Sequence, residues 1–132
     1  MIVVDTSALI VIVQNEPERA EFTRLIAHAP RRFVSTVSLL EASLVAHTRR
    51  GQAGLIALDE IVADAEVEIV PFDDAQRRLA VQAFIRFGKG NNPRSRLNFG
   101  DCAVYALAKS MNAPLLFKGD DFAATGLVPA RA

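Results

Sequence analysis

Acidic residues follow two of the apolar runs that we expect to form strands. Asp5 comes directly after residues 2–4, and Asp120 and Asp121 come shortly after residues 114–117. Ligands of open parallel sheets bind beyond the carboxyl ends of the strands, so both places favour functional carboxylates. The alternative for each is local, with Asp5 capping the next helix and Asp120 and Asp121 forming a turn.

Glu41 stands on an apolar stripe of a predicted helix. The residues that share its face, three, four and seven positions later, are Leu44, Val45 and Thr48. Burying a lone carboxylate is costly. Glu41 is therefore paired, protonated or bound to a metal ion, unless its side chain reaches solvent from the surface.

Asp101 makes a similar case at the start of another predicted helix. The segment that follows, residues 102–108, is apolar on every side, and a helix of that kind is buried. The first turn of a helix also favours negative charge. The alternative is that Asp101 is a plain N-cap.

A single bound cation would account for Asp5, Glu41 and Asp101 together, because carboxylates crowded at one sheet edge otherwise repel one another. Oxygen ligands alone favour a hard ion, Mg²⁺ or Mn²⁺. His28 and His47 have no partner at metal-ligand spacing. The sequence therefore predicts a magnesium or manganese site made of carboxylates.

A basic segment without acids lies immediately before Asp101. Its positive residues are Arg86, Lys89, Arg94 and Arg96, and glycines, asparagines and a proline make residues 88–93 a loop. Positive side chains beside a metal site suit a phosphodiester backbone. A solvated surface loop is the alternative.

The apolar periodicity places these residues on alternating strands and helices. We expect strands at residues 2–4, 32–36, 67–70 and 114–117, and helices at residues 8–13, 17–28, 39–50, 53–65, 74–87 and 99–111. Ser38 is the expected cap of the helix that Gly51 ends. Alternation of this kind predicts an α/β sandwich with a mostly parallel central sheet flanked by helices.

The composition favours one domain over residues 1–132. Apolar residues make up 51% of the chain and the mean hydropathy is +0.22, so we expect part of the apolar surface to lie in a homodimer interface. Basic and acidic residues number 15 each, which argues against nucleic-acid binding by bulk positive charge. The single cysteine, Cys102, suits a reducing cytoplasm, and no apolar run is long enough to span a membrane.

Four segments together resemble PIN-domain ribonucleases, and among them the VapC toxins of bacterial toxin–antitoxin pairs. The segments are residues 2–9 (IVVDTSAL), 38–41 (SLLE), 97–102 (LNFGDC) and 115–122 (LLFKGDDF). Any one of them is common, but four in this order over nearly the whole chain are specific. The resemblance implies a PIN-like three-layer sandwich, metal-dependent cleavage of RNA that leaves a 5′-phosphate, and inhibition by a cognate antitoxin.

The resemblance also assigns roles to the acids. It maps the family's acidic residues onto Asp5, Glu41, Asp101 and Asp121, with Asp5 and Asp101 holding the main ion. Many PIN domains carry a further acid at the position where this chain has Gly119. The neighbouring Asp120 is therefore an alternative fourth acid.

The same resemblance places weaker contacts around that site. Thr6 or Ser7 would hydrogen-bond a ligand carboxylate or the scissile phosphate, and Lys89, Arg94 and Arg96 would contact the RNA. We expect the antitoxin to lay a tail along the apolar surface near residues 39–50 and to offer an Arg to the acids, because a guanidinium bonds two oxygens at once.

Two other function classes remain open at this point. A receiver-like signalling domain also has an acid after its first strand, and Lys118 would match its lysine after the last strand. Its phosphate acceptor would have to be Asp73 or Asp74, which look like a helix cap. The other class is a non-catalytic protein-binding module.

Overall fold

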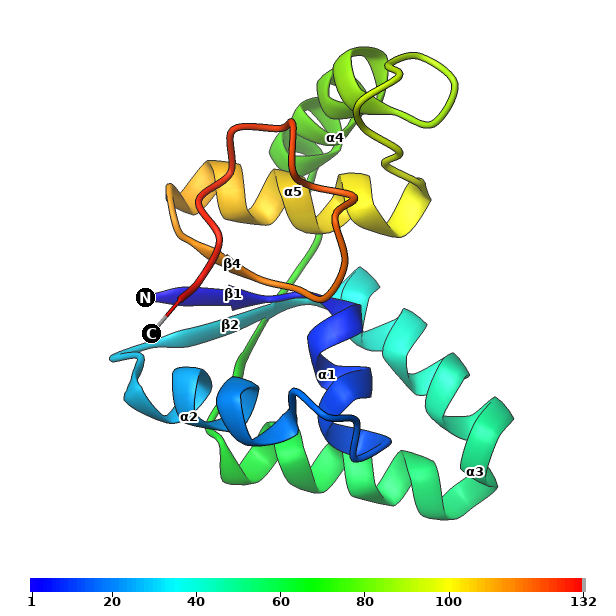
Figure 1. Cartoon of the computed structure of the whole chain (residues 1–132), viewed down its shortest axis with the longest axis vertical. Helices are drawn as coiled ribbons and strands as arrows, with labels where there is room; N and C mark the ends of the chain where they lie inside the picture. The colour runs from blue at the N-terminus through cyan, green and yellow to red at the C-terminus, as the bar shows by residue number, and fades with distance from the viewer. Residues whose placement is uncertain (132) are drawn as a thin grey trace.

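A computed structural model describes residues 1–131 and shows a sheet between two layers of helices (Figure 1). The strands are β1 (Ile2–Val4), β2 (Arg32–Ser35), β3 (Glu68–Val70) and β4 (Leu115–Leu116). The helices are α1 (Thr6–Val13), α2 (Arg19–His28), α3 (Thr36–Asp64), α4 (Asp74–Phe87) and α5 (Phe99–Met111). The predicted three-layer α/β sandwich is confirmed.

The sheet has the strand order β3-β2-β1-β4, and every pair is parallel. Alternate residues of β1 face opposite layers, because side chains of a strand alternate in direction. Ile2 and Val4 belong to the core beneath α1, α2 and α3, whereas Val3 belongs to the core beneath α4 and α5. Burial on both faces explains why the whole β1 sequence is apolar.

The chain changes direction across the sheet beside β1. From β1 it continues to β2 and β3 on one side, and β4 then joins β1 on the other side. Such a reversal opens a crevice at the carboxyl ends of the two strands between which it occurs. Asp5 follows β1 and residues 117–122 follow β4, so both segments border this crevice.

Helix α3 differs from the prediction at its start. It begins at Thr36 and is capped by Ser35, whose Oγ accepts from the backbone N–H of Val37 at 3.2 Å. Ser38, the predicted cap, lies buried inside the helix. Gly51 interrupts α3 with a non-helical conformation, φ 60° and ψ −145°, so two helical stretches meet at a kink there and the prediction that Gly51 ends the first of them is confirmed.

The segment that follows β4 covers that edge of the sheet. Leu115 donates its backbone N–H to Val128 at 2.9 Å, and Ala130 donates to Leu115 at 2.8 Å. Both ends of the described chain therefore lie near the amino ends of the strands (Figure 1). None of the described helices combines the length and apolarity needed to cross a bilayer.

Candidate active site

Asp5 is the most deeply buried acid of the crevice, with 5% of its surface exposed. It caps α1, and its Oδ2 accepts both the backbone N–H of Ser7 at 3.1 Å and the Ser7 hydroxyl at 2.6 Å. Burial raises the pKa of this carboxyl and the nearby Glu41 charge raises it further, although the Ser7 hydrogen bonds oppose the shift. Asp5 is therefore both a helix cap and a carboxylate whose charged form is disfavoured by burial and by a nearby negative charge.

Ser7 connects Asp5 to the turn after β4. Its Oγ accepts the backbone N–H of Lys118 at 2.9 Å. The Lys118 ammonium is in turn paired with Glu16 at 2.5 Å and with Glu18 at 3.2 Å, in the connection after α1. Sequence reasoning missed this link, since its members lie more than a hundred positions apart along the chain.

Asp101 lies at the third position of α5 rather than at its cap. Asn98 is the cap: its Oδ1 accepts from the Asp101 N–H at 2.9 Å, and Asp101 Oδ2 accepts from the Asn98 N–H at 3.1 Å. This reciprocal capping box fixes the carboxylate at the start of the helix. Burial, followed by the charges of Asp5, Asp121 and Glu41, raises the pKa of Asp101 to about 7.

Glu41 reaches the start of α5 from the first part of α3. A Cβ at position 100 would lie 2.6 Å from Glu41 Oε1, so a side chain there would displace this carboxylate from its place beside the helix. Gly100 is thus a residue of the site that sequence reasoning did not single out. The signal was present, because a glycine in the first turn of a helix lowers its stability and needs a reason.

The turn after β4 brings one of its two acids to the site. Phe117 and Phe122 hold this turn by an edge-on ring contact with centroids 5.1 Å apart, and Phe122 is buried. The charge of Asp121 acts on the pKa of Asp101, whereas Asp120 is not among the causes of that shift. Of the two acids, Asp121 is thus the one whose charge acts on Asp101.

Thr6 does not take the predicted role beside the acids. Its hydroxyl is buried and donates to the Ser38 backbone carbonyl at 2.9 Å, which ties α1 to α3. Of the two predicted residues, Ser7 rather than Thr6 has the hydroxyl that bonds a carboxylate. Ser7 alone bonds an acid in this way.

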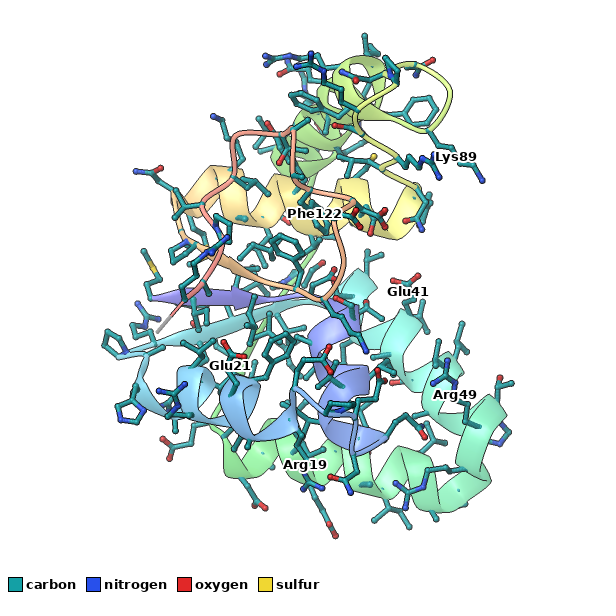
Figure 2. All side chains as sticks on the ribbon, viewed as in Figure 1. Arg19, Glu21, Glu41, Arg49, Lys89 and Phe122 are labelled. Carbon is teal, nitrogen blue, oxygen red and sulfur yellow. The ribbon has the colours of Figure 1, made fainter. Side chains whose placement is uncertain are left out.

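The basic segment forms a closed loop beside the start of α5. Backbone hydrogen bonds join Lys89 to Leu97 and Leu97 to Phe87 at its base. Lys89, Arg94 and Arg96 are exposed, and no ion pair holds any of them within the described residues. Figure 2 shows Lys89 and Glu41 on the same side of the molecule.

The donor set suits a hard divalent cation. Asp5, Glu41, Asp101 and Asp121 offer carboxylate oxygens only, and their mutual repulsion is visible in the raised pKa of Asp101. Within residues 1–131, no three acids, histidines or cysteines stand close enough together to hold an ion as they are placed. A cation that relieves this repulsion would draw the flexible Glu41 and Asp121 side chains inward.

Comparison with known proteins matches this arrangement to one family. The family model of the PIN domain matches residues 2–127. The chain belongs to the PIN-domain family. Two similar PIN-domain relatives are ribonuclease VapC28 of Mycobacterium tuberculosis, 42% identical with 95% of this chain and 94% of the relative covered, and ribonuclease VapC of Mycolicibacterium smegmatis, 43% identical with 93% and 95% covered.

Solved PIN-domain structures share the fold. The crystal structure of Mycobacterium tuberculosis VapC20, described as a Sarcin-Ricin loop cleaving toxin, superposes over 100% of both chains with a TM-score of 0.81 at 21% identity. The VapBC2 complex of Rickettsia felis, bound to a promoter DNA fragment, gives 0.79 at 16% identity over 98% of this chain and 97% of that chain. The resemblance to VapC-type PIN domains is confirmed.

Membership of the PIN-domain family excludes a receiver domain. Asp73, one of the two acids that could have been the phosphate acceptor of a receiver, caps α4 by accepting from the Gln76 N–H at 2.8 Å.

Proposed function

We propose that this PIN domain is a divalent-metal-dependent endoribonuclease and the toxin of a toxin–antitoxin pair. The observation that carries the proposal is the approach of Asp5, Glu41 and Asp121, from three other segments, to Asp101, whose pKa is raised to about 7 by burial first and then by these three charges. The relatives' names, ribonuclease VapC28 and ribonuclease VapC, support RNA as the substrate.

The residues divide the work of phosphodiester hydrolysis. Asp5 and Asp101 would hold the main Mg²⁺ or Mn²⁺, and Glu41 and Asp121 would shape the site or hold a second ion. When bound, the ion supplies positive charge against the phosphoryl oxygens and makes water a better nucleophile near neutral pH. Ser7 orients Asp5 through its 2.6 Å hydrogen bond.

The exposed loop would position the RNA. Lys89, Arg94 and Arg96 are exposed and would offer positive charge to phosphates, and Lys89 lies on the side of the molecule that carries Glu41 (Figure 2). Hydrolysis that expels the 3′ oxygen leaves a 5′-phosphate on the downstream product. Contacts of this kind position the strand, whereas base preference depends on groups that face the bases.

Incubation of the purified protein with total RNA, with and without Mg²⁺, followed by mapping of the cut ends, tests the proposal. We expect magnesium-dependent cuts with 5′-phosphate ends, and Asp101→Asn should abolish them without unfolding the protein. Asp74→Asn is the matched control, because Asp74 is an exposed acid at the start of α4, paired with Arg77 and Arg78. Cleavage by Asp101→Asn at the wild-type rate would show that Asp101 is not a catalytic ligand.

We further propose that an antitoxin tail occupies the apolar groove beside Glu41. This groove, of about 400 Å³, is lined by Val37, Leu40, Leu44, Val45, Phe99 and Gly100 around Glu41. Leu40 and Leu44 are 58% and 61% exposed, so an apolar tail would bury a large surface here. An Arg on that tail would reach the acids. The VapBC complexes of Rickettsia felis and Salmonella typhimurium support a protein partner.

The proposed homodimer would use the outer face of α4. Val81, Phe84 and Ile85 are exposed there, and Phe84 borders an apolar pocket of about 430 Å³ shared with Phe72 and Phe99. Sedimentation at micromolar concentration should give twice the 14.3 kDa mass of the chain. A single species at the monomer mass would contradict the homodimer.

A further inference from the structure

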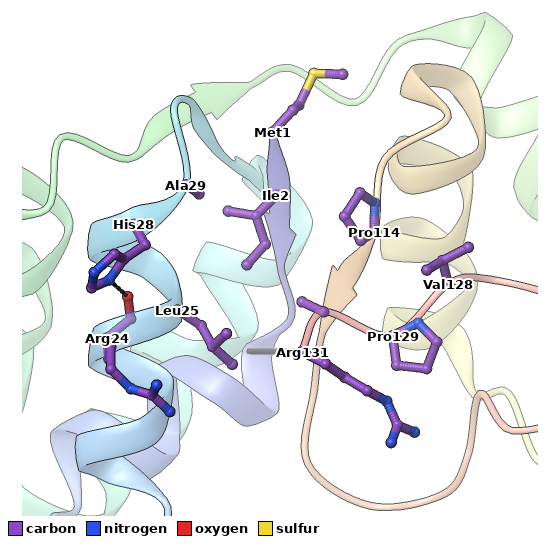
Figure 3. A pocket seen from close by; sticks show the side chains of 11 residues that line it. Met1, Ile2, Arg24, Leu25, His28, Ala29, Pro114, Val128, Pro129 and Arg131 are labelled. Carbon is purple, nitrogen blue, oxygen red and sulfur yellow. Dashed lines mark hydrogen bonds between the residues drawn. The ribbon is translucent and has the colours of Figure 1, made fainter.

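A second pocket lies at the opposite edge of the sheet from the carboxylates. It encloses about 600 Å³ at the amino ends of β1 and β4, where Ile2 and Pro114 form part of its wall. Helix α2 closes one side and the C-terminal segment closes the other (Figure 3). Nothing in the proposed cleavage of RNA uses this pocket.

The polar side chains of this pocket are basic. Arg24 comes from α2 and Arg131 from the C-terminal segment, on its two sides (Figure 3). No acid is among the lining residues that the structure describes. Glu21, one turn before Arg24 on α2, forms no ion pair with it within residues 1–131. Two guanidinium groups around one hollow favour an anion.

His28, on α2 like Arg24, is a further polar residue that lines the pocket. Its Nδ1 lies 2.8 Å from the backbone carbonyl of Arg24. Because a carbonyl can only accept, the proton of the neutral ring is on Nδ1, and Nε2 is then an acceptor for a donor group of a ligand, such as an amino group or a hydroxyl, rather than for its phosphate. This hydrogen bond also holds the imidazole against α2 beside the pocket (Figure 3).

The rest of the wall is apolar. Ile2, Leu25, Pro114, Val128 and Pro129 supply side chains without hydrogen-bonding groups. The volume lies within the range of small-molecule sites, and a few polar groups on an apolar wall are typical of them. A ligand that fits has one strongly anionic end and a body that can lie against aliphatic and proline side chains.

We propose that this pocket binds a nucleoside monophosphate group, with the phosphate between Arg24 and Arg131 and the base against the apolar wall. A phosphate monoester carries a charge of about −2 at neutral pH, which matches two fixed guanidinium charges better than a carboxylate does. The group can be a free nucleotide or the 5′-phosphorylated end of an RNA strand, since both present the same chemistry.

Titrations of the full chain in EDTA, where RNA stays intact, test the assignment by amide NMR. AMP should shift the resonances of α2 and of residues 128–131, and adenosine and benzoate should bind more weakly. Arg24→Gln and Arg131→Gln should each weaken AMP binding by about ten- to hundredfold, because each removes a charge-assisted hydrogen bond. Arg49→Gln, an exposed substitution on α3 outside the pocket, should leave it unchanged.

A short RNA with and without a 5′-phosphate distinguishes the two sources of the ligand. If the phosphorylated RNA competes with AMP and the unphosphorylated RNA does not, the pocket binds strand ends. If AMP binds and neither RNA competes with it, the pocket binds free nucleotides. The proposal is overturned if AMP shifts only the loop at residues 88–96, if benzoate or adenosine binds as tightly as AMP, or if both pocket variants bind AMP like the wild type. Unchanged melting temperatures of the variants would show that the fold is intact, since both arginines are exposed.

Discussion

The hydroxyl of Ser7 donates to Asp5 Oδ2 over 2.6 Å. The Ser7 Oγ itself accepts the backbone N–H of Lys118 over 2.9 Å. One small side chain therefore holds a buried acid of the proposed metal site and fixes the start of the turn that carries Asp121. Ser7 therefore couples the position of Asp5, after β1, to that of the turn after β4, although no direct hydrogen bond joins Asp5 to Asp121 among the described residues.

Ser7→Ala should lower kcat for RNA cleavage by about ten- to hundredfold, the cost of losing a hydrogen bond to a charged group. The Asp5 carboxylate would lose a donor, so its pKa would rise further and it would compete less well for the ion. We expect the Mg²⁺ concentration for half-maximal activity to rise while KM for RNA changes little. Metal titrations of the cleavage rate measure both.

Ser43→Ala is the matched control for this variant. The Ser43 hydroxyl donates to the Leu39 carbonyl within α3 at 2.7 Å, and among the described residues it forms no hydrogen bond with an acid. It should leave the metal requirement unchanged, and Ser7→Thr should restore part of the loss. Equal metal requirements for Ser7→Ala and Ser43→Ala would show that Ser7 does not position Asp5.

The stability of the metal-free protein should fall as pH rises from about 4 to about 7. The folded state keeps a proton on Asp101 up to about pH 7, whereas the unfolded chain loses it near the ordinary value of 3.8. Between these values the folded state binds more protons, so raising the pH favours unfolding. Burial also raises the pKa of Asp5, which acts in the same direction.

Thermal unfolding in EDTA at a series of pH values measures this effect. Asp101→Asn should flatten the dependence, and Mg²⁺ should stabilise the wild type more at the alkaline end, where the carboxylates are charged and free to bind it. A melting temperature that rises over this range, or an unchanged slope in Asp101→Asn, would contradict the electrostatic description of the site.

Gly100→Ala should separate stability from activity. Alanine is favoured over glycine in a helix by about 1 kcal/mol, and the atom in its way is the movable end of Glu41, 2.6 Å from the new Cβ. We expect the folded state to be unaffected or slightly stabilised and RNA cleavage to fall, because Glu41 must leave its place. Chemical denaturation and cleavage rates on the same preparation measure the two effects.

Gly54→Ala, on α3, should lower stability rather than the activity of the folded protein. A Cβ there would lie 2.3 Å from the backbone carbonyl oxygen of Ala46, which cannot move aside without bending the helix. This variant should lose stability, with activity falling only as the folded fraction falls.

Full cleavage by Gly100→Ala would show that the site does not depend on the position of Glu41.

The sequence predicted the strand ends and most helices because their signals are local. The β-branched run before Asp5 and the apolar stretch after Asp101 each identify their own element. Local signals failed where two residues compete for one role, as at the start of α3, where Ser35 rather than Ser38 is the cap. The choice between Thr6 and Ser7 was left open for a related reason, since the partner of the Thr6 hydroxyl is a carbonyl of another helix.

The contacts between segments could not be predicted from spacing. Lys118 pairs with Glu16 and Glu18 across the crevice, and the room that Gly100 leaves for Glu41 depends on how α3 and α5 meet. These relations appear only once the sheet order is known. The effect of the Asp121 charge, and not that of Asp120, on the pKa of Asp101 is of the same kind, because the spacing of adjacent residues does not distinguish them.

The last prediction concerns how the proposed antitoxin inhibits. The groove beside Glu41 is apolar along Leu40 and Leu44 and acidic at its end, so affinity and inhibition should depend on different residues. Leu44→Asp in this chain should weaken binding of the antitoxin strongly, because it places a charge in the apolar contact. Replacing the antitoxin's tail Arg with Ala should weaken binding little but leave residual RNA cleavage in the complex, because the carboxylates remain open to the ion. Calorimetric binding and cleavage by the saturated complex measure the two effects, and an Arg→Ala antitoxin that still inhibits fully would show that the acids are not its target.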